Sequence, residues 1–537
     1  MLHNEAQVMT NAPTPEPPKR RNAFTRFLDT VEWLGNFLPH PVTLFAVLAV
    51  GIVLLSGIFG WIGLAVEDPR PAGTRGVAED GMIRAVSLLN AEGIRMIFTN
   101  LVANFTSFAP LGVVLVAMLG VGVAERSGLL SAAVRGMVLS APRHVVTVAI
   151  VFAGIVSNTA SEVGYVVLIP LAGAIFYALD RHPLAGMAAA FAGVSGGYSA
   201  NVLIGTIDPL LAGITQEAAR LIDPDYVVVA TANWYFMVAS TFLITLVGSL
   251  VSIFIVEPKL GKYDSSAADP TLLDKRMMER LSGDEKKGLL WALIALIGVL
   301  GLMALTLVPE WGVFRNPETG DRINSPFFRG FVVWILIFFI ATGYAYGRAV
   351  GTMRTDRDVI DAMAKALASL GLYIVLVFFA AQFVAFFGWT NLGAISAVTG
   401  AEFLKETGMT GPMVFIFFIL MCAVINLSLG SASAQWAVTA PIFVPMLMLI
   451  GYAPEAIQAA YRIGDSTTNI ITPMMSYFGL ILAWATRYDK NLGVGTMIAI
   501  MLPYTIFFII VWSSFFILWT FTLGLPVGPG SPTFYNP

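Results

Sequence analysis

Residues 461–469 read YRIGDSTTN and lie in the middle of an apolar segment long enough to cross a membrane. Gly, Asp, Ser, Thr and Asn are all poorer helix formers than Ala or Leu, and Pro473, which follows them, has no backbone N–H. A helix interrupted inside a bilayer exposes N–H and C=O groups, each costing several kcal/mol unless they line a cavity or meet a ligand. The stretch therefore predicts a broken membrane helix over 455–485.

The first half of the chain contains a second segment of this kind. The run SGGYSAN, residues 195–201, interrupts the apolar segment 184–214, and Pro209 follows it. Freed carbonyls and Ser, Thr or Asn oxygens at such breaks suit a hard cation such as Na⁺, while helix N-termini attract anions. We therefore expect both broken helices to serve a ligand site.

Each broken segment is preceded by an apolar stretch, 143–180 or 412–450, that is too long for one crossing. Both stretches carry small polar residues at mid-length, SNTAS from Ser157 and SASAQ from Ser431. This pattern suits a helical hairpin that enters the membrane partway and returns. Asn158 lies twelve residues before Pro170 and Ser433 twelve before Pro445, so we treat the two tips as equivalent.

The two halves repeat one order of segments: a span, a second span with an amphipathic lead-in, a hairpin, a broken span and a final span. An extra linker span between the halves would put the second half in the membrane upside down, the layout of many secondary transporters. We predict an all-α polytopic membrane protein with two re-entrant hairpins and nine full crossings, at 41–64, 107–125, 184–214, 232–257, 288–309, 327–347, 367–388, 455–485 and 494–522.

The distribution of basic residues sets the orientation of this arrangement. With both hairpins re-entrant, one side carries 21 Lys and Arg and the other side nine. Positive residues concentrate on the cytoplasmic side, which places the N-terminus inside and the C-terminus outside. The expected units are a disordered cytoplasmic tail 1–22, a first repeat 23–257, a cytoplasmic loop and linker span 258–310, a second repeat 311–522 and a periplasmic tail 523–537.

Composition excludes several other classes of protein. Hydrophobic residues make up 57% of the 537 and charged residues 12%, which disfavours a soluble enzyme. A net charge of −3 implies no basic surface for nucleic acid. One Cys and four dispersed His provide no cluster for a transition metal, and no phosphate-binding loop of an ATP-driven pump is present. We expect no cofactor beyond a coupling ion.

Three charged residues lie more than five positions from the nearer end of a predicted crossing. Arg462 and Asp465 are three residues apart on one helix face, so they form either a mutual structural ion pair or separate contacts with a substrate carboxylate and a coupling cation. Asp208 in the first half is either a helix-cap residue or a comparable functional acid. Trp436, just past the second hairpin tip, could stack an aromatic ring or simply pack.

At these motifs the sequence resembles the AbgT family of p-aminobenzoyl-glutamate transporters, from about Phe24 to Phe521. The resemblance implies a homodimer in the bacterial inner membrane that moves p-aminobenzoyl-glutamate or related folate-pathway anions, with sulfonamide export in some members. It also implies a substrate set of Asp208, Ser433, Trp436, Arg462, Asp465 and Pro473. The hairpin tips and breaks add a tentative cation set of Ser157, Asn158, Thr159, Asn201, Thr467 and Asn469.

The leading hypothesis is an ion-coupled secondary transporter of aromatic anions. An intramembrane aspartyl protease using Asp208 and Asp465 is the alternative, although the local sequences lack the patterns of such enzymes. A passive channel is disfavoured because a pore needs no inverted pair of hairpin gates. The sequence leaves both the direction of transport and the choice between Na⁺ and H⁺ open.

Overall fold

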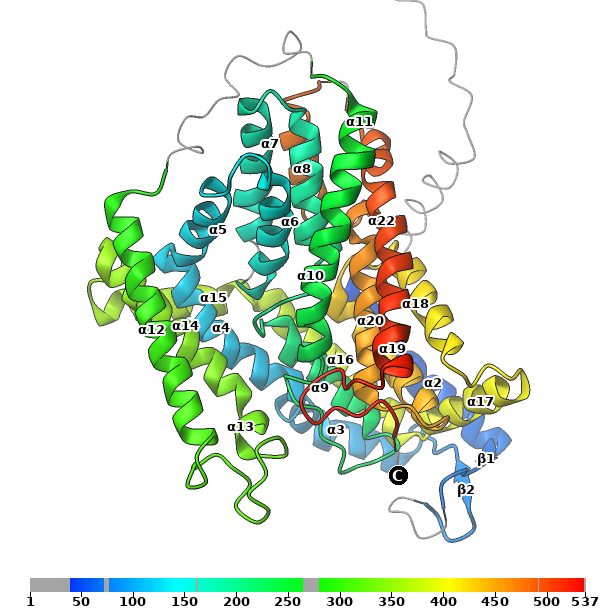
Figure 1. Cartoon of the computed structure of the whole chain (residues 1–537). Coiled ribbons are helices and arrows are strands. Elements are labelled where there is room, and N and C mark those ends of the chain that lie inside the picture. The colour runs from blue at the N-terminus through cyan, green and yellow to red at the C-terminus, as the bar shows by residue number, and fades with distance from the viewer. Residues whose placement is uncertain (1–38, 72–76, 161–162, 264–279, 491, 536–537) are drawn as a thin grey trace, which may run out of the picture.

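The computed structural model describes residues 39–71, 77–160, 163–263, 280–490 and 492–535, and the predicted tail 1–22 lies outside them (Figure 1). The described chain is almost entirely helical, so the predicted all-α membrane class is confirmed. Its one small sheet is an antiparallel pair, β1 (Ala65–Glu67) with β2 (Met82–Arg84), at the lower edge of Figure 1.

Seven helical stretches of the described chain are long and apolar enough to span a bilayer. They are α2 (Pro41–Ile62), α3 (Ala91–Thr106) continuing into α4 (Ala109–Ser127), α10 (Trp234–Val251) continuing into α11 (Glu257–Leu260), α12 (Gly283–Leu307), α14 (Phe331–Val350), α16 (Gly371–Trp389) and α22 (Val494–Ile517) with its last turn to Thr522. The two broken segments fall below this length because each is divided, and the count of nine crossings stays a prediction.

Both predicted hairpins form as pairs of short helices. The first hairpin consists of α6 (Val146–Ser157) and α7 (Ile169–Ala178), the latter preceded by a π turn over Gly164–Leu168. The second consists of α18 (Met413–Asn426) and α19 (Ala432–Met448). Each arm is too short to cross about 30 Å of hydrocarbon at 1.5 Å per residue, as a re-entrant hairpin requires.

The two broken helices follow the hairpins. In the first, α8 (Pro183–Phe191) continues as a π turn to Gly196, and α9 (Ile207–Ala219) begins eleven residues after that glycine. In the second, α20 (Pro454–Thr468) ends in the polar run and α21 resumes as Phe478–Ala485. Weak helix formers end the first piece in both cases, as their propensities dictate.

The hairpins enter from opposite faces of the molecule (Figure 1). At the open end of the first hairpin, Arg181 pairs at 2.6 Å with Glu257, the first residue of α11, and α11 lies near the top of Figure 1. At the open end of the second, the backbone N–H of Ala453 donates at 3.0 Å to the Thr533 carbonyl in the C-terminal segment, which lies near the bottom of Figure 1. This opposition is what an inverted repeat requires.

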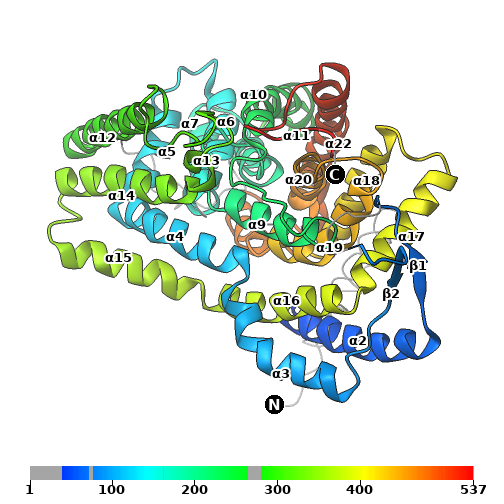
Figure 2. The same cartoon turned by 90° about the horizontal axis from the view of Figure 1, so that it is seen from below.

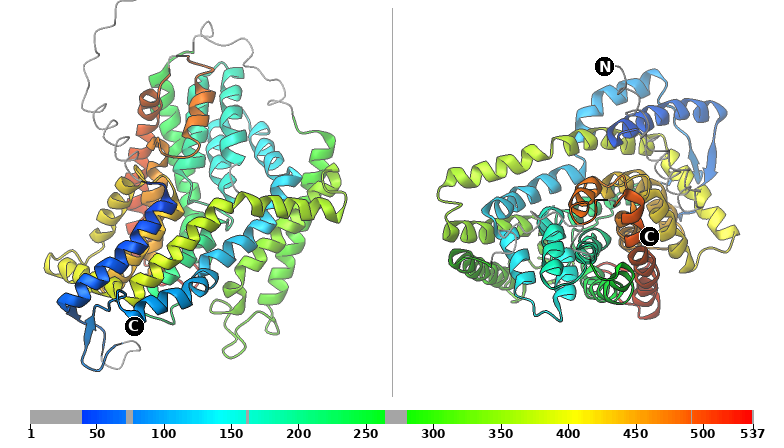
Figure 3. Two further views of the ribbon diagram at one scale, coloured as in Figure 1. Left: turned by 180° about the vertical axis from the view of Figure 1, so that it is seen from behind. Right: turned by 90° about the horizontal axis from the view of Figure 1, so that it is seen from above.

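Three shorter helices occupy regions that the sequence reading had treated as loops or lead-ins. They are α5 (Leu129–Leu139), α15 (Asp356–Ser369) and α17 (Leu392–Glu406). Seen from below (Figure 2) and from behind (Figure 3), α4, α14, α15 and α16 form a lateral layer, with α2 and α3 beside α16. The hairpins and broken helices make up the bundle beside this layer and position the site.

The two repeats also share a hydrogen bond between the first hairpin arm and the following broken helix. At the end of α6, Asn158 donates its side-chain N–H to the carbonyl of Val194 at 2.8 Å. At the end of α18, Asn426 donates in the same way to the carbonyl of Asp465 at 2.7 Å. The structural counterpart of Asn158 is therefore Asn426, which corrects the sequence-based pairing with Ser433. Equal spacing to a proline indicated the wrong residue because the two hairpins differ in the number of residues between this asparagine and the proline of the second arm.

A glycine accompanies each of these asparagine bonds. A Cβ at Gly193 would lie 2.4 Å from the Val151 carbonyl oxygen, and one at Gly464 would lie 2.5 Å from the Ile419 carbonyl oxygen. Each carbonyl belongs to the residue seven positions before the hairpin asparagine. In both repeats the first hairpin arm thus rests directly on the backbone of the following broken helix.

Candidate functional site

A polar cavity of about 560 Å³ lies where the hairpin tips and the two breaks meet. Three of the residues predicted to converge there, Asn158, Ser433 and Asn469, line it together. Among its described lining residues Glu125 is the only one that carries a charge. The lining comes from both hairpins, both breaks, α4, the segment 369–370 and α9, so both repeats contribute to one space.

One end of a helix faces this cavity. Gly430, Ser431, Ala432 and Ser433, which lead into and begin α19, all line it. The first turn of α19 has no acidic residue and Ser431 makes no side-chain capping bond, so its backbone N–H groups are available to an anion. The hydroxyls of Ser431 and Ser433 are 3.5 Å apart beside them.

The cavity also has an aromatic wall. Tyr165 from the first hairpin and Tyr477 from the second break stack at 4.6 Å between ring centroids and 10° between planes, and both line the cavity. Tyr198 from the first break is a third lining residue. Sequence reasoning missed these tyrosines as site residues, although Tyr198 lies inside the polar run that marked the first break.

Arg462 forms its ion pair with Asp208, across the two repeats. One guanidinium N–H group lies 2.7 Å from the Asp208 carboxylate, and another donates to the carbonyl of Ser199 at 2.9 Å. The other Asp208 oxygen accepts from the backbone N–H of Gly205 at 2.7 Å. Arg462 is 1% exposed and does not line the cavity.

The mutual Arg462–Asp465 ion pair considered from the sequence is not formed, since these two described side chains have no N–O contact within 4.0 Å. The tertiary structure explains why Arg462 has another partner, because α9 brings Asp208 to the guanidinium from the opposite repeat. The arrangement also gives no support to an aspartyl protease dyad, because both Asp208 oxygens are engaged by other groups. A dyad requires two carboxylates sharing one proton at close range.

Asp465 lies fully buried beside this ion pair. One of its oxygens is 3.5 Å from the Tyr461 hydroxyl, and the other has no hydrogen-bond partner among the described residues. The side-chain oxygen of Asn426 is likewise buried and lacks a partner there, while its N–H group bonds to the Asp465 carbonyl. Each of these unpartnered buried oxygens is costly unless a cation or a proton accompanies it.

The side chains of the predicted cation set differ in their hydrogen-bond partners and in whether they face the cavity. The hydroxyls of Ser157 and Thr467 donate to carbonyls in their own helices. Thr159 donates to the Asn201 side chain at 2.7 Å, which ties the first hairpin tip to the first break. Asn469 accepts from Asn426 at 2.8 Å and faces the cavity.

Trp436 lies behind the cavity wall. Its ring stacks on Tyr461 at 4.2 Å between centroids, its N–H donates to Thr215 at 2.9 Å, and it is fully buried. Pro473 is partly exposed in the second break, just before the lining residues Met475 to Tyr477. Of the six predicted substrate residues, only Ser433 lines the cavity in this conformation.

Direct contacts between the two breaks hold the site together. The backbone N–H of Ser199, in the first break, donates to the Ser466 hydroxyl in the second at 3.1 Å. Asn426, which sequence reasoning overlooked, connects the second hairpin to α20 through three bonds. Its signal was present: it is the first polar residue after the long apolar run of α18. Among the described residues, no group of three or more His, Cys, Asp or Glu could hold a metal.

Comparison with known proteins gives a consistent result. Residues 26–535 match a family model described as "AbgT putative transporter family". The p-aminobenzoyl-glutamate transport protein of Escherichia coli strain K12 is 35% identical over 500 residues, covering 93% of this chain and 95% of that protein.

Two solved structures are similar over nearly the whole fold. MtrF of Neisseria gonorrhoeae, described as illuminating a class of antimetabolite efflux pumps, superposes with a TM-score of 0.89 at 59% identity, covering 94% of this chain and all of that one. The YdaH transporter of Alcanivorax borkumensis, described as having an unusual topology, gives a TM-score of 0.84 at 44% identity, covering 91% of this chain and all of that one.

Proposed function

Because the chain belongs to the AbgT transporter family, we propose that it carries p-aminobenzoyl-glutamate or a related folate-pathway aromatic anion across the bacterial inner membrane. Transport is coupled to a Na⁺ or H⁺ gradient, and sulfonamide antimetabolites are further substrates. The observation that carries the proposal is the cavity lined by both repeats, with a helix N-terminus and a tyrosine pair in its wall.

Such a substrate has two kinds of group to accommodate. Its carboxylates suit the start of α19, where free backbone N–H groups and the Ser433 hydroxyl meet the cavity. Its aromatic ring suits the wall that contains Tyr165 and Tyr477. The Arg462 guanidinium is already neutralised by Asp208, so its role in this state is to fix α20 against α9.

The substrate contacts are tested by transport kinetics in proteoliposomes with radiolabelled p-aminobenzoyl-glutamate. Ser433→Ala and Tyr477→Leu should each raise KM about tenfold. The first removes a hydrogen bond to a charged group, which contributes roughly 1.5–3 kcal/mol, and the second removes an aromatic contact, which contributes roughly 0.5–1.5 kcal/mol. Matched controls are Ser514→Ala and Tyr344→Leu, whose side chains are exposed on the outside of the helix bundle. Equal KM values for all four variants and the parent would contradict this placement.

Coupling rests on Asp465 and Asn426, whose unpartnered oxygens adjoin the second break. We expect Asp465→Asn to fold, to keep substrate exchange between equal ion concentrations, and to lose at least tenfold in gradient-driven transport. Asp284→Asn, at an exposed position at the start of α12, is the control. Na⁺ and H⁺ gradients imposed separately identify the ion. Full gradient-driven transport by Asp465→Asn would show that this carboxylate does not couple.

A further inference from the structure

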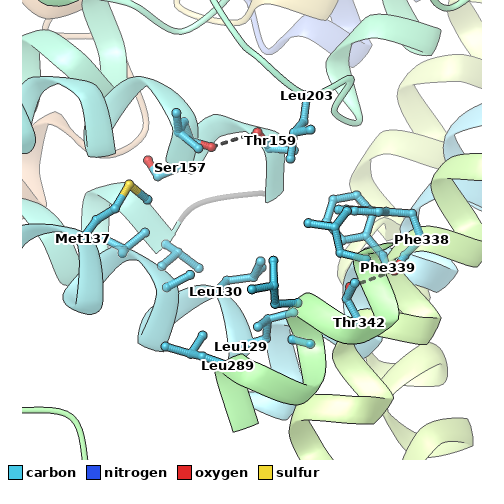
Figure 4. Close-up of a pocket in the computed structure, with 17 residues that line it drawn as sticks. Leu129, Leu130, Met137, Ser157, Thr159, Leu203, Leu289, Phe338, Phe339 and Thr342 are labelled. Carbon is cyan, nitrogen blue, oxygen red and sulfur yellow. Dashed lines mark hydrogen bonds between the residues drawn. The ribbon is translucent and has the colours of Figure 1, made fainter. Parts of the chain in front are cut away.

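A second cavity of about 320 Å³ lies apart from the polar one, between the first hairpin tip and the helices α5, α12 and α14 (Figure 4). Nearly all of its lining is apolar. The walls are Leu129, Leu130, Ala133, Val134 and Met137 of α5, then Val156, Ser157, Thr159, Val163 and Leu203 near the first tip and break, Leu289, Ala292, Leu293 and Leu296 of α12, and Phe338, Phe339 and Thr342 of α14.

The cavity offers an occupant no polar recognition. Its three hydroxyls already donate to acceptors in the protein: Ser157 to the Gly154 carbonyl, Thr159 to the Val156 carbonyl and Asn201 side chain, and Thr342 to the Phe338 carbonyl. The volume is about twice the ~150 Å³ of an engineered apolar cavity that stays dry and takes up benzene. The ligand that fits is therefore an apolar chain.

The cavity lies at a depth where the surroundings are acyl chains. Leu293 and Leu296 lie about 15–20 Å along α12 from its first residue, near the middle of a hydrocarbon layer about 30 Å thick. The mouth contains side chains that face outward, since Leu203 is 41% and Leu293 49% exposed. Much of α12 is similarly outward-facing, with Ile297 61% exposed, so lipid has direct access to this helix.

One face of α12 connects the cavity to the membrane surface. Lys286, Leu289, Leu293 and Leu296 follow one another at spacings of three, four and three residues, which places them in one stripe of the helix. Lys286 is exposed, and no carboxylate of the described residues lies within 4.0 Å of its ammonium group. The neighbouring acid, Glu285, is paired with Arg135 instead. From Lys286 to Leu296 the stripe measures about 15 Å, the half-thickness that an acyl chain fills.

We propose that this stripe and cavity form a binding site for one anionic phospholipid, with its phosphate at Lys286 and one acyl chain inserted between α5, α12, α14 and the first hairpin tip. The charge of Lys286 selects the headgroup, and the apolar walls accept the chain. Because Ser157, Thr159 and Val163 belong to the tip region, the inserted chain fixes that tip against α12 and α14. The site is independent of the proposed transport substrate.

Photolabelling of the full-length protein in phosphatidylcholine nanodiscs tests the proposal. The probe is phosphatidylglycerol with a diazirine near the end of one acyl chain, and phosphatidylcholine with the same labelled chain is the reference. We expect phosphatidylglycerol to label peptides 129–137, 289–296 and 338–342 at least fivefold more than the reference does. Excess unlabelled phosphatidylglycerol should suppress the labelling, which tests the site in the unmodified protein.

Substitutions test the acyl-chain cavity and the headgroup contact at Lys286 one at a time. Ala133→Trp fills the cavity and should reduce labelling at least tenfold, whereas Ala295→Trp on another face of α12 should not. Lys286→Gln should abolish the preference for phosphatidylglycerol, while Lys287→Gln, the same change about 100° around the helix, should leave it. Any of four results would overturn the proposal. Labelling could spread evenly over the exposed helices, or unlabelled phosphatidylglycerol could fail to compete with the probe. The two lysine variants could have equal effects, or a second copy of the chain could close the mouth of the cavity to the probe.

Discussion

At the scale of single residues, Arg462 and Asp208 form an ion pair that connects the two repeats. The pair is almost fully enclosed, with side-chain exposures of 1% and 9%, and it links α20 of one repeat to α9 of the other. Separating two charges in such surroundings leaves one of them uncompensated, at a cost of about 3–5 kcal/mol. The pair therefore determines how firmly the two broken helices stay together.

A double-mutant cycle measures this interaction. Asp208→Asn and Arg462→Gln should each lower the free energy of unfolding by about 3–5 kcal/mol, and the double variant should recover about 1–3 kcal/mol of the summed loss. Thermal unfolding in detergent provides the measurement. The cycle of Arg462→Gln with Asp465→Asn is the comparison and should show the smaller coupling, because those two side chains do not pair. The opposite ranking would mean that Arg462 changes partner.

At the scale of helices, each hairpin and the broken helix after it form one mechanical unit. The first arm of each hairpin contacts a glycine and bonds through an asparagine to an adjacent carbonyl, at Gly193 and Asn158 in one repeat and at Gly464 and Asn426 in the other. A hairpin tip held in this way cannot move without its broken helix. Any opening of the cavity must therefore move both together.

Enlarging these glycines should disrupt the unit. Gly193→Ala and Gly464→Ala each force a methyl group against a backbone carbonyl, so we expect a loss of about 1–3 kcal/mol in stability. Gly298→Ala in α12 is the control, because a Cβ there meets no atom within 4 Å and Ala favours the helix. Thermal unfolding compares the three variants. If Gly193→Ala and Gly464→Ala unfolded at the control's temperature, the helices would not be in fixed contact.

At the scale of the whole molecule, the inverted repeat predicts opposite accessibility of the two hairpins. In a variant with Cys422→Ser, a cysteine at His182 should react with a membrane-impermeant maleimide only from the cytoplasmic side, and one at Gly451 only from the periplasmic side. Labelling of right-side-out cells and inverted vesicles distinguishes the two. Reaction of both positions from the same side would contradict the inverted repeat.

The outer face of α2 favours a homodimer. Val47, Val50, Leu54 and Ile58 form an apolar stripe along α2, each more than half exposed in the single chain. We predict that cysteines at Val50 or Leu54 cross-link two copies in membranes, whereas a cysteine at Ser433 in the cavity does not. Gel mobility under non-reducing conditions is the readout. Cross-links obtained only through Ser433 would reverse the assignment of scaffold and moving parts.

The sequence by itself determined the membrane class, the places where helices break and the two hairpins, because these depend on local chemistry. A polar run such as residues 461–469 interrupts a helix wherever it lies, and apolar length alone decides what can span a bilayer. Short helices such as α5, with 11 residues, and α15, with 14, were missed because both are too short to stand out as membrane crossings.

The tertiary structure alone decided the partners. The i, i+3 spacing of Arg462 and Asp465 permitted a local pair, yet α9 brings Asp208 to the guanidinium from the other repeat. Equal spacing to a proline suggested Ser433 as the counterpart of Asn158, yet the backbone contacts of the hairpin arm select Asn426. Which polar residues face the cavity and which, like Trp436, lie behind its wall depends on the packing of helices far apart in the chain, and no local pattern encodes that packing.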